Sequence, residues 1–426
     1  MPKHSTRWHA AGVSAGLAAI WAFKIVQFRR TAGATLDIPN PPAAGTPHFA
    51  RLLETLTQAP LREGNRIEIL RNGCQIFPSL LEEINAAQET ICLSTYIFWA
   101  GGAAEDIAKA LATRAMEGLE VKILLDAWGS AKLDNLVVEM WKQAGAEVVW
   151  FRPVRGYQFH KMNHRMHRRI VVMDGKIAFV GGVGIAEQWE GDADDPDHWR
   201  ETHVRIEGPA VRDALGGFIE NWAEATGALL TGRHLPDLQP FDNGVPVLIT
   251  RSSPHGGSEA TEELFFAAIL GARRRLWITT CYFAPRAGFI HALCDAARRG
   301  VDVRILVNGR EIDKEVVRKA GQRSYGKLLE AGVRIYEYQK ARLHAKVILV
   351  DDDWANVGSA NFDNRSFALE EEINVSIYDG SLVSQLAEHF REDVAVSDEM
   401  SLQVWQARPV SVRLAELAAE VVRQSL

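Results

Sequence analysis

Two short segments of the chain carry the same set of chemically capable residues. Residues 167–174 read HRRIVVMD and residues 344–351 read HAKVILVD, so each places a histidine two positions before a cation and seven before an aspartate. Side chains two positions apart in a β-strand point to the same face, so each histidine would project beside its cation, Arg169 or Lys346. One such segment is typical of an ordinary hairpin strand. Two of them indicate a shared site.

Paired imidazoles and cations are suited to breaking a phosphodiester. A neutral imidazole can attack phosphorus and form a phosphohistidine, while an imidazolium can protonate the leaving oxygen. The negative equatorial oxygens need cations or hydrogen-bond donors. His167 and His344 could therefore divide these tasks across one cleft, with Arg169 and Lys346 holding the phosphate. This chemistry requires no metal ion or other cofactor, and the sequence shows no cluster with metal-ligand spacing.

Small and polar residues follow each segment at matching distances. A glycine lies fourteen positions after each histidine, at Gly181 and Gly358. The next residues, Gly182 and Ser359, would let the backbone approach a phosphate closely, and Ser359 adds a hydroxyl donor. Asn361 could donate its side-chain amide to an equatorial oxygen.

The first copy departs from the second at one of these positions. Gly184 stands where the second copy has Asn361, so the first half lacks one donor. Asp174 and Asp351 complete the two motifs, and we include them in the catalytic set. Their strand-to-turn positions also predict carboxylates that tie down local backbone or link the two halves. Asp174-Gly175 between two apolar runs predicts a hairpin turn.

The surrounding sequence is duplicated as well. The apolar stretches 91–99 and 276–284 are typical of buried strands, and each is followed by a helical stretch and a further strand, within 105–126 and 288–308. Strands that alternate with helices at this spacing predict α/β units. A chain of 426 residues also exceeds what one core normally holds. We therefore predict two tandem α/β units with mixed, largely parallel sheets flanked by helices and related by a pseudo-two-fold axis.

These motifs resemble those of a known family. The paired HxK/RxxxxD segments are similar to the motifs of the phospholipase D superfamily. Within it, residues 167–189, 198–211 and 343–367 resemble bacterial cardiolipin synthases. The similarity extends from about Glu63 to Asp379 and covers both halves of the chain.

The resemblance implies a membrane-associated phosphatidyltransferase. Such an enzyme would move a phosphatidyl group from one phosphatidylglycerol to another through a phosphohistidine, releasing glycerol. The family pattern implies that His167 is the nucleophile and His344 the acid. It also places carboxylate partners for the imidazoles at Glu201 and Glu372, although Glu201 could instead be a surface charge.

Other functions remain open on the same residues. A phospholipase D hydrolase would use identical groups and release phosphatidic acid. A phospholipase D-type nuclease is a further alternative, but the formal net charge of −6 argues against a protein that neutralises nucleic-acid phosphates. A binding module without catalysis is disfavoured because both histidines and both cations are present. We therefore expect phospholipid substrates and a membrane surface as partners, and no nucleic acid; the sequence leaves the oligomeric state open.

The N-terminus predicts an attachment to the membrane. Residues 8–28 are largely apolar, but their uninterrupted apolar core of 14 residues is shorter than the roughly 20 residues that span a bilayer. A membrane anchor or interfacial helix, a signal peptide and a packing helix all fit this segment. We expect a location at the cell membrane, as an inner (cytoplasmic) membrane protein with peripheral catalytic units. The predicted organisation is an N-terminal apolar helix, a Pro-rich linker and lead-in, and two phospholipase D-like repeats, at residues 1–30, 31–62, 63–240 and 241–426.

A basic segment and several tryptophans add to the predicted lipid contacts. Residues 151–173 contain six Lys or Arg, three His and no acid, which favours either a solvated loop or a patch that attracts anionic headgroups. Within this segment, Tyr157, Phe159 and Met162 could sit among acyl chains. The sequence is compatible with either an interfacial rim or ordinary core packing for four tryptophans: Trp99, Trp128, Trp189 and Trp199. The four cysteines show no CxxC spacing, so free thiols and a reducing compartment are expected.

Overall fold

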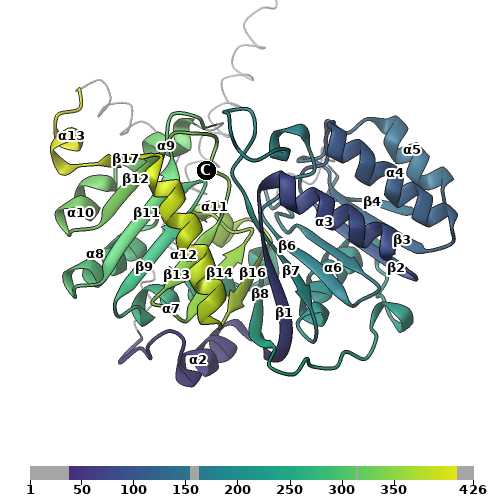
Figure 1. Ribbon diagram of the computed structural model, residues 1–426, viewed down its shortest axis with the longest axis horizontal. Coiled ribbons are helices and arrows are strands. Elements are labelled where there is room, and N and C mark those ends of the chain that lie inside the picture. The colour runs from purple at the N-terminus through teal and green to yellow at the C-terminus, as the bar shows by residue number, and fades with distance from the viewer. Residues whose placement is uncertain (1–37, 154–162, 313–314, 410–426) are drawn as a thin grey trace, which may run out of the picture.

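The computed structural model describes residues 38–153, 163–312 and 315–409. At its centre is one sheet of 15 strands in the order β17-β12-β11-β9-β13-β14-β16-β8-β1-β7-β6-β5-β2-β3-β4. Figure 1 shows this sheet crossing the whole molecule, with the first half of the chain on the right and the second half on the left. Strands β1 (Leu61–Arg71) and β8 (Val245–Ser252) pair antiparallel at the centre and join the halves.

The first half alternates strands with helices and then returns through a hairpin. Helices α3, α4 and α5 contribute to one hydrophobic cluster, whereas α6 packs against β4, β5 and β6 in another. After β1, the elements in chain order are α3 (Asn72–Ala86), β2 (Thr90–Thr95), α4 (Gly102–Met116), β3 (Glu120–Asp126), α5 (Asn135–Gln143), β4 (Glu147–Phe151), β5 (Ile170–Met173), β6 (Ile177–Gly181), the 3-10 turn η1 (Glu187–Trp189), β7 (Thr202–Glu207), α6 (Val211–Thr226) and η2 (Gly232–His234).

The second half repeats this plan with a few insertions. Strands β10 and β15 form a separate parallel pair beside the main sheet. After β8, the elements are η3 (Pro254–Gly256), α7 (Ala260–Gly271), β9 (Arg275–Thr279), β10 (Phe283–Ala284), α8 (Ala287–Arg298), β11 (Asp302–Asn308), α9 (Glu315–Gln322), α10 (Tyr325–Glu330), β12 (Arg334–Tyr338), β13 (Val347–Val350), β14 (Trp354–Gly358), β15 (Phe362–Asp363), α11 (Asn364–Ala368), β16 (Glu372–Ile377), α12 (Gly380–Ala395), β17 (Ser397–Met400) and α13 (Leu402–Gln406).

The strand order confirms the predicted pseudo-two-fold relation. Outward from the centre, β1-β7-β6-β5-β2-β3-β4 in the first half corresponds to β8-β16-β14-β13-β9-β11-β12 in the second. In each half, one long helix follows the strand that lies beside the central pair: α6 comes after β7, and α12 comes after β16. Helices α3 and α12 lie in front of the sheet in Figure 1, one on each half. The duplicated sequence therefore folds into two matching α/β units that share one sheet.

The mixed α/β class is confirmed, but the parallel part of the sheet is smaller than predicted. Parallel pairing holds for β2-β3-β4 and β9-β11-β12, whereas the inner strands around β1 and β8 pair antiparallel. The reason is local: β5 and β13 turn directly into β6 and β14 through Asp174 and Asp351, at φ 52° and 51°. A tight turn can only join antiparallel strands. The predicted hairpin at 174–175 is thus confirmed.

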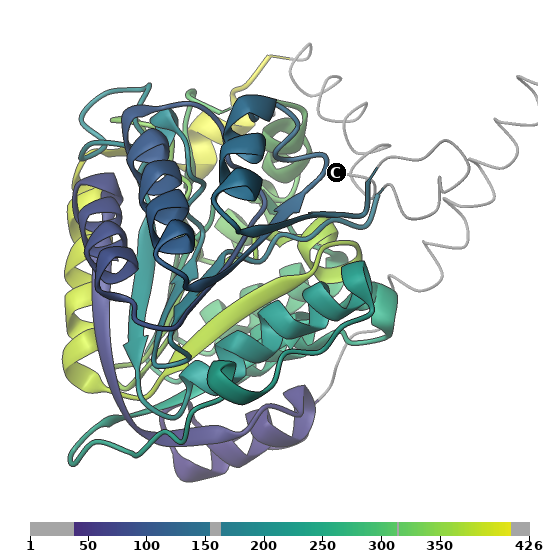
Figure 2. The ribbon, with the colours of Figure 1, turned by 90° about the vertical axis from the view of Figure 1, so that its right-hand side faces the viewer.

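The segment predicted as a linker contains a helix. Helix α2 (Pro47–Thr57) begins where the Thr46 hydroxyl accepts the Phe49 N–H over 3.2 Å, with proline in its first turn. Its buried face includes Phe49 and Leu53, and Figure 2 shows it lying along α7 at the lower edge of the molecule. Thus residues 47–57 belong to the folded core, because their apolar spacing gives them a face to bury.

Several predictions concern residues outside the described part. The N-terminal apolar helix at 1–30 and the aromatic residues Tyr157 and Phe159, with Met162, lie there. Among the helices of residues 38–153, 163–312 and 315–409, none combines the length and the apolar character needed to cross a bilayer.

Candidate active site

The two histidines lie at the junction of the halves, each just before an inner strand. The backbone N–H of His167 donates to the Glu371 carbonyl oxygen over 2.9 Å, and the N–H of His344 donates to the Arg200 carbonyl oxygen over 2.8 Å. His167 precedes β5 in the first half, and His344 precedes β13 in the second. Each histidine is therefore fixed by backbone from the opposite half. Both side chains are buried.

A carboxylate from the opposite half contacts each imidazole. Nδ1 of His167 lies 3.0 Å and 3.1 Å from the two carboxylate oxygens of Glu372, and Nδ1 of His344 lies 2.5 Å from Oε2 of Glu201. A carboxylate accepts hydrogen bonds, so Nδ1 of each ring carries the hydrogen and Nε2 presents its lone pair. This crossed arrangement leaves Nε2 of both rings as the atoms that can attack phosphorus or move a proton.

The two predicted cations lie beside the histidines. Nη1 of Arg169 donates to the His167 carbonyl oxygen over 2.5 Å, and Nζ of Lys346 lies 2.9 Å from Nδ1 of His344. Both cations are buried, and burial lowers the pKa of each side chain. The Nε atom of Arg169 is buried without a hydrogen-bond partner among the described residues. Concentrated positive charge and an unused donor are what a phosphate group would satisfy.

The two carboxyl groups differ strongly in electrostatics. Burial alone would raise the pKa of Glu201, but the Lys346 ammonium and the His344 ring outweigh burial and lower this pKa to about 2. Burial raises the pKa of Glu372 to about 7, although hydrogen bonds from Ser359 and other groups oppose the shift. At neutral pH, Glu201 is therefore ionised, whereas Glu372 takes up a proton much more readily.

The difference between the two carboxyl groups also makes the two imidazoles electrostatically different. Burial, followed by the Arg169 guanidinium, lowers the pKa of His167 well below its ordinary value, and the His344 ring adds to this effect. Burial and Lys346 lower the pKa of His344 to about 4, against the attraction of Glu201. Both rings are neutral without substrate. A bound phosphate anion raises both pKa values, and ionised Glu201 makes His344 the ring better able to hold a proton.

Ser359 and Gly182 occupy the predicted region but contact protein groups. The Ser359 hydroxyl donates to Oε2 of Glu372 over 2.5 Å and accepts the Ile373 N–H over 3.0 Å. A Cβ added to Gly182 would lie 2.7 Å from Oε2 of Glu201, so this glycine makes room for the carboxylate. Both predicted phosphate-binding positions therefore lie against the histidines' carboxylate partners: Glu372 is the first residue of β16, and Glu201 directly precedes β7.

The position where the copies differ has a clear structural reason. A Cβ on Gly184 would lie 2.8 Å from Cζ3 of Trp189, whose ring packs against His344 at 5.1 Å between centroids. Asn361, the counterpart in the second half, is buried, and its side-chain carbonyl oxygen has no partner among the described residues. The glycine thus makes room for an aromatic ring where the other half carries an amide.

The motif aspartates do not join the histidine cluster. Asp174 accepts the backbone N–H groups of residues 88–90 at 2.7–2.9 Å, and Asp351 accepts those of residues 273–275 at 2.7–3.3 Å. These contacts lie at the opposite ends of β5 and β13 from the histidines. Each carboxylate ties the hairpin turn to the chain entering β2 or β9, which is the alternative that their turn positions predicted. We propose that the two aspartates act there rather than in the catalytic set.

Replacing Asp351 by alanine is expected to reduce stability rather than chemistry. Loss of a buried carboxylate that accepts three backbone N–H groups should lower the free energy of unfolding by about 2–4 kcal/mol. Asp351→Asn keeps one acceptor oxygen and tolerates the positive φ, so it should lose less. Urea denaturation and the rate per folded molecule check this. A rate drop above about 100-fold in the folded variant, of the size lost with a catalytic acid or base, would return Asp351 to the catalytic set.

One cluster has the composition of a metal site. His167, Glu370 and Glu372 place potential ligand atoms within 4.8 Å of one another. Their carboxylates are already engaged, since Oε1 of Glu370 accepts Nε of Arg365 over 2.5 Å and Glu372 accepts the Ser359 hydroxyl. The donor set therefore fits a hydrogen-bonded imidazole surrounded by cations better than a metal ion.

Other cations predicted to attract headgroups are buried in ion pairs. In the described part of 151–173, Arg152 contacts Glu224 at 2.7 Å, Arg165 contacts Asp126 at 3.0 Å, and Arg168 contacts Glu220 at 2.7 Å. All three arginines are buried. Neither a solvated loop nor a headgroup patch describes them. They fix the segment that leads to His167. The basic residues of this segment do not indicate such a role in the sequence alone.

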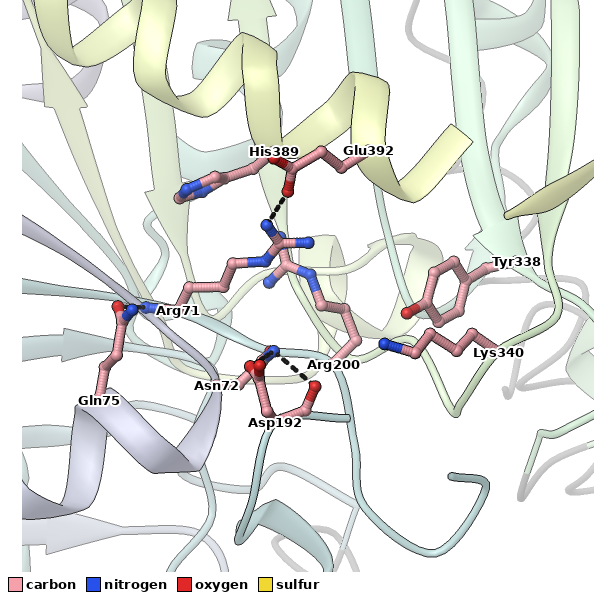
Figure 3. Close-up of a pocket in the computed structure, with 9 residues that line it drawn as sticks. All are labelled: Arg71, Asn72, Gln75, Asp192, Arg200, Tyr338, Lys340, His389 and Glu392. Carbon is pink, nitrogen blue, oxygen red and sulfur yellow. Dashed lines mark hydrogen bonds and ion pairs between the residues drawn. The ribbon is translucent and has the colours of Figure 1, made fainter. Parts of the chain in front are cut away.

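A polar cavity of about 370 Å³ lies near the same junction (Figure 3). Its cations are paired across the halves: Arg71 and Arg200 each contact Asp393 at 3.0 Å, and Lys340 contacts Asp194 at 2.8 Å. The backbone of Arg200 holds His344, while its side chain lines this cavity. These ion pairs clamp the two units together and so preserve the crossed histidine–carboxylate contacts.

Comparison with known proteins agrees with this geometry. A family model described as "Cardiolipin synthase, PLD-like domain" matches residues 80–213 and 265–394. Cardiolipin synthase of Geobacillus kaustophilus (strain HTA426) is 36% identical over 375 residues, which are 87% of this chain and 74% of that protein. Probable cardiolipin synthase YwiE of Bacillus subtilis (strain 168) is 33% identical over 364 residues, 84% of this chain and 71% of that protein.

Similarity of fold extends to solved structures. Phosphatidylserine synthase of Haemophilus influenzae Rd KW20 superposes with a TM-score of 0.70 at 15% identity, covering 89% of this chain and all of that chain. Each of the two matched regions contains one histidine together with the carboxylate that contacts the other histidine: His167 with Glu201, and His344 with Glu372. The chain therefore belongs to the cardiolipin synthase family of phospholipase D-like proteins and is a phosphatidyltransferase that acts on phospholipids.

Proposed function

We propose that the chain transfers a phosphatidyl group from one phosphatidylglycerol to a second, forming cardiolipin and releasing glycerol. The observation that carries this proposal is the crossed arrangement of two imidazole–carboxylate pairs, one imidazole from each half. Two imidazole–carboxylate pairs suit two successive half-reactions. One ring makes and breaks a bond to phosphorus, while the other gives and then takes a proton.

In the first half-reaction, Nε2 of His167 attacks the phosphorus of the first phosphatidylglycerol in line. The P–N bond forms as the P–O bond to glycerol breaks, and protonated His344 gives its proton to the departing glycerol oxygen. Arg169 and Lys346 hold the two non-bridging oxygens, whose charge must be stabilised in the transition state. The Glu372 carboxyl group accepts the Nδ1–H of His167 and orients the ring for attack.

The second half-reaction reverses these tasks. A hydroxyl of the second phosphatidylglycerol attacks phosphorus, and the now neutral His344 takes the hydroxyl proton. The P–N bond breaks as the new P–O bond forms, and His167 returns to its neutral state. The acid of one step is thus the base of the next, which microscopic reversibility favours when both steps share one geometry.

A direct test uses purified full-length protein and vesicles of phosphatidylglycerol. We expect cardiolipin and glycerol in equal amounts, identified by mass spectrometry and an enzymatic glycerol assay. Phosphatidic acid as the main product would show a hydrolase instead, and a product that requires another added alcohol would show a different acceptor. His291→Ala, a change on the exposed face of α8, serves as a control that should leave product formation unchanged.

We also propose that residues 1–30 attach the enzyme to the cell membrane while the two units remain peripheral, at the cytoplasmic membrane. Their apolar stretch is flanked by basic residues, which suits an anionic bilayer surface. Deleting residues 1–30 should lower the fraction that sediments with phosphatidylglycerol vesicles more than it lowers activity in detergent micelles. Unchanged sedimentation would place the membrane attachment elsewhere.

A further inference from the structure

The two imidazoles have different aromatic neighbours. The ring of His344 contacts Trp189 at 5.1 Å and Trp199 at 5.4 Å between centroids. The ring of His167 contacts Tyr96 at 5.3 Å. Tyr96 carries a hydroxyl, and the carboxylate of Glu370 lies 3.5 Å from Nδ1 of His167. The surroundings of His344 are thus more apolar on this side than those of His167.

The two tryptophans form a rigid unit, here called the tryptophan pair. Their ring centroids are 4.2 Å apart, Trp189 is completely buried, and Trp199 is 7% exposed. The backbone N–H of Trp199 donates to the Gln188 carbonyl oxygen over 2.6 Å, which ties the backbone of Trp199 to the residue before Trp189. A Cβ on Gly73, at the start of α3, would collide with the Trp189 carbonyl oxygen, so this loop is pressed against the helix. The pair is therefore held in place from two sides.

Gly184 leaves the space that Trp189 of this pair occupies. A Cβ there would lie 2.8 Å and 2.9 Å from Cζ3 and Cη2 of Trp189, closer than real Cβ contacts allow. The second half carries Asn361 at the equivalent place. At the position where the second half carries an amide, the first half therefore has a glycine that leaves room for an indole ring in contact with the proton-carrying histidine.

We propose that the tryptophan pair keeps water away from His344 and thereby sets the preference for transfer over hydrolysis. The inference rests on the proposed function. In the second half-reaction, neutral His344 deprotonates whichever hydroxyl lies against Nε2, and that oxygen forms the bond to phosphorus as the P–N bond to His167 breaks. If the hydroxyl belongs to water, the product is phosphatidic acid.

The physical reason is the cost of placing water against an apolar wall. A water molecule beside two indole rings loses hydrogen bonds that it cannot replace against their carbon atoms. A lipid alcohol loses less, because its chain is held elsewhere and only its hydroxyl must reach Nε2. Both nucleophiles use the same histidines, so the wall changes which product forms more than it changes how fast His167 is phosphatidylated.

The experiment compares product ratios in three variants. Trp189→Ala opens the wall, Trp189→Phe keeps an apolar ring, and Gly184→Ala leaves both tryptophans in the chain but pushes Trp189 from its place. On phosphatidylglycerol vesicles we expect the ratio of phosphatidic acid to cardiolipin to rise at least tenfold in Trp189→Ala and in Gly184→Ala. Trp189→Phe should stay within about threefold of the parent, a change of less than 1 kcal/mol in relative barrier height.

Three controls make the outcome decisive. Gly256→Ala adds a methyl group at a surface turn, where the nearest atom is the Ser253 hydroxyl oxygen at 3.3 Å, and should leave the ratio unchanged. Total consumption of phosphatidylglycerol per folded molecule, measured with thermal unfolding, separates a changed preference from damage to the fold. Glycerol released per folded molecule reports the first half-reaction independently, because each phosphatidylation of His167 releases one glycerol whichever hydroxyl later accepts the group.

A parent enzyme that makes no cardiolipin would overturn the proposed function itself. A parent that makes cardiolipin, with variants that lose total rate but keep the product ratio, would overturn the inference alone. If Trp189→Phe and Trp189→Ala raised the ratio equally, the apolar wall would not be the cause. Equal ratio changes in Trp189→Ala, in Gly184→Ala and in the double variant would support it, since both changes remove the same contact.

Discussion

Replacing His167 by alanine is expected to lower the initial rate of cardiolipin formation by at least about 10⁴-fold, because the variant loses the atom that bonds to phosphorus. Replacing His344 should cost about 10²–10⁴-fold, the range for a single general acid and base. Both variants should fold, since the backbone N–H contacts to Glu371 and Arg200 do not need the rings. Radiolabelled phosphatidylglycerol and circular dichroism provide the measurements.

The two losses should not multiply. A double variant that lacks both rings should be no slower than His167→Ala, because His344 acts only on the reaction that His167 begins. His389→Ala removes a half-buried ring beside the polar cavity and is a matched control with no expected effect on the first half-reaction. A rate in His167→Ala within tenfold of the parent would exclude a covalent histidine intermediate at this position.

The second large effect is expected at the carboxylates, and it should be unequal. Glu201→Gln removes a negative charge that is fully present at neutral pH, because the pKa of Glu201 is lowered to about 2. The rate should fall by about 10³–10⁴-fold, as for other carboxylates that orient a catalytic imidazole. Glu372→Gln should cost about tenfold or less, since the pKa of Glu372 is raised to about 7 and the glutamine resembles its protonated form.

The direction of the pH dependence follows from the same charges. His344 must be protonated to release glycerol, so the rate falls as pH rises above its pKa in the enzyme–substrate complex. Removing the charge of Glu201 lowers that pKa, and the falling limb should move to lower pH in Glu201→Gln. Glu372→Gln should leave this limb in place. Profiles of kcat against pH for both variants check this, and a shift toward higher pH in Glu201→Gln would contradict the assignment of the proton carrier.

Local pattern was sufficient to predict much of the fold. The duplicated strands and helices, the hairpin at Asp174 and the pseudo-two-fold relation all follow from short-range spacing in the sequence. The number of antiparallel inner strands is larger than the sequence pattern indicates, because a tight turn fixes the direction of the two strands it joins but not their neighbours in the sheet. The helix at residues 47–57 was hidden by the prolines around it, although Thr46 before Pro47 is a typical N-terminal signal.

The site was predictable in composition but not in its crossed contacts. Glu201 and Glu372 were named as imidazole partners, yet the sequence does not tell which ring each contacts. That pairing joins His167 to a residue 205 positions away, and only the arrangement of the two units determines it. For the same reason, the sequence does not tell that Ser359 contacts Glu372 or that Gly182 makes room for Glu201.

The contribution of Trp189 could not be inferred from its own surroundings in sequence. The sequence around Trp189 is equally compatible with an interfacial rim and with a core position. The structure places Trp189 and Trp199 in the core against His344, whereas Trp128 is 59% exposed. The available signal was Gly184, whose difference from Asn361 marks space for a large neighbour. A missing side chain in one copy of a repeat indicates free space, and the structure is needed to identify Trp189 as the residue that fills it.

The most direct measurement follows the covalent intermediate on each histidine. A phosphatidyl ester of p-nitrophenol needs no proton for its leaving group, so His344→Ala should still release one equivalent of nitrophenol and then stall without its base. Peptide mass spectrometry after rapid quenching should find the phosphatidyl group on His167 of that variant, and on neither histidine of His167→Ala. A phosphatidyl group on His344, or sustained turnover by His167→Ala, would show that the two imidazoles do not divide the reaction in this way.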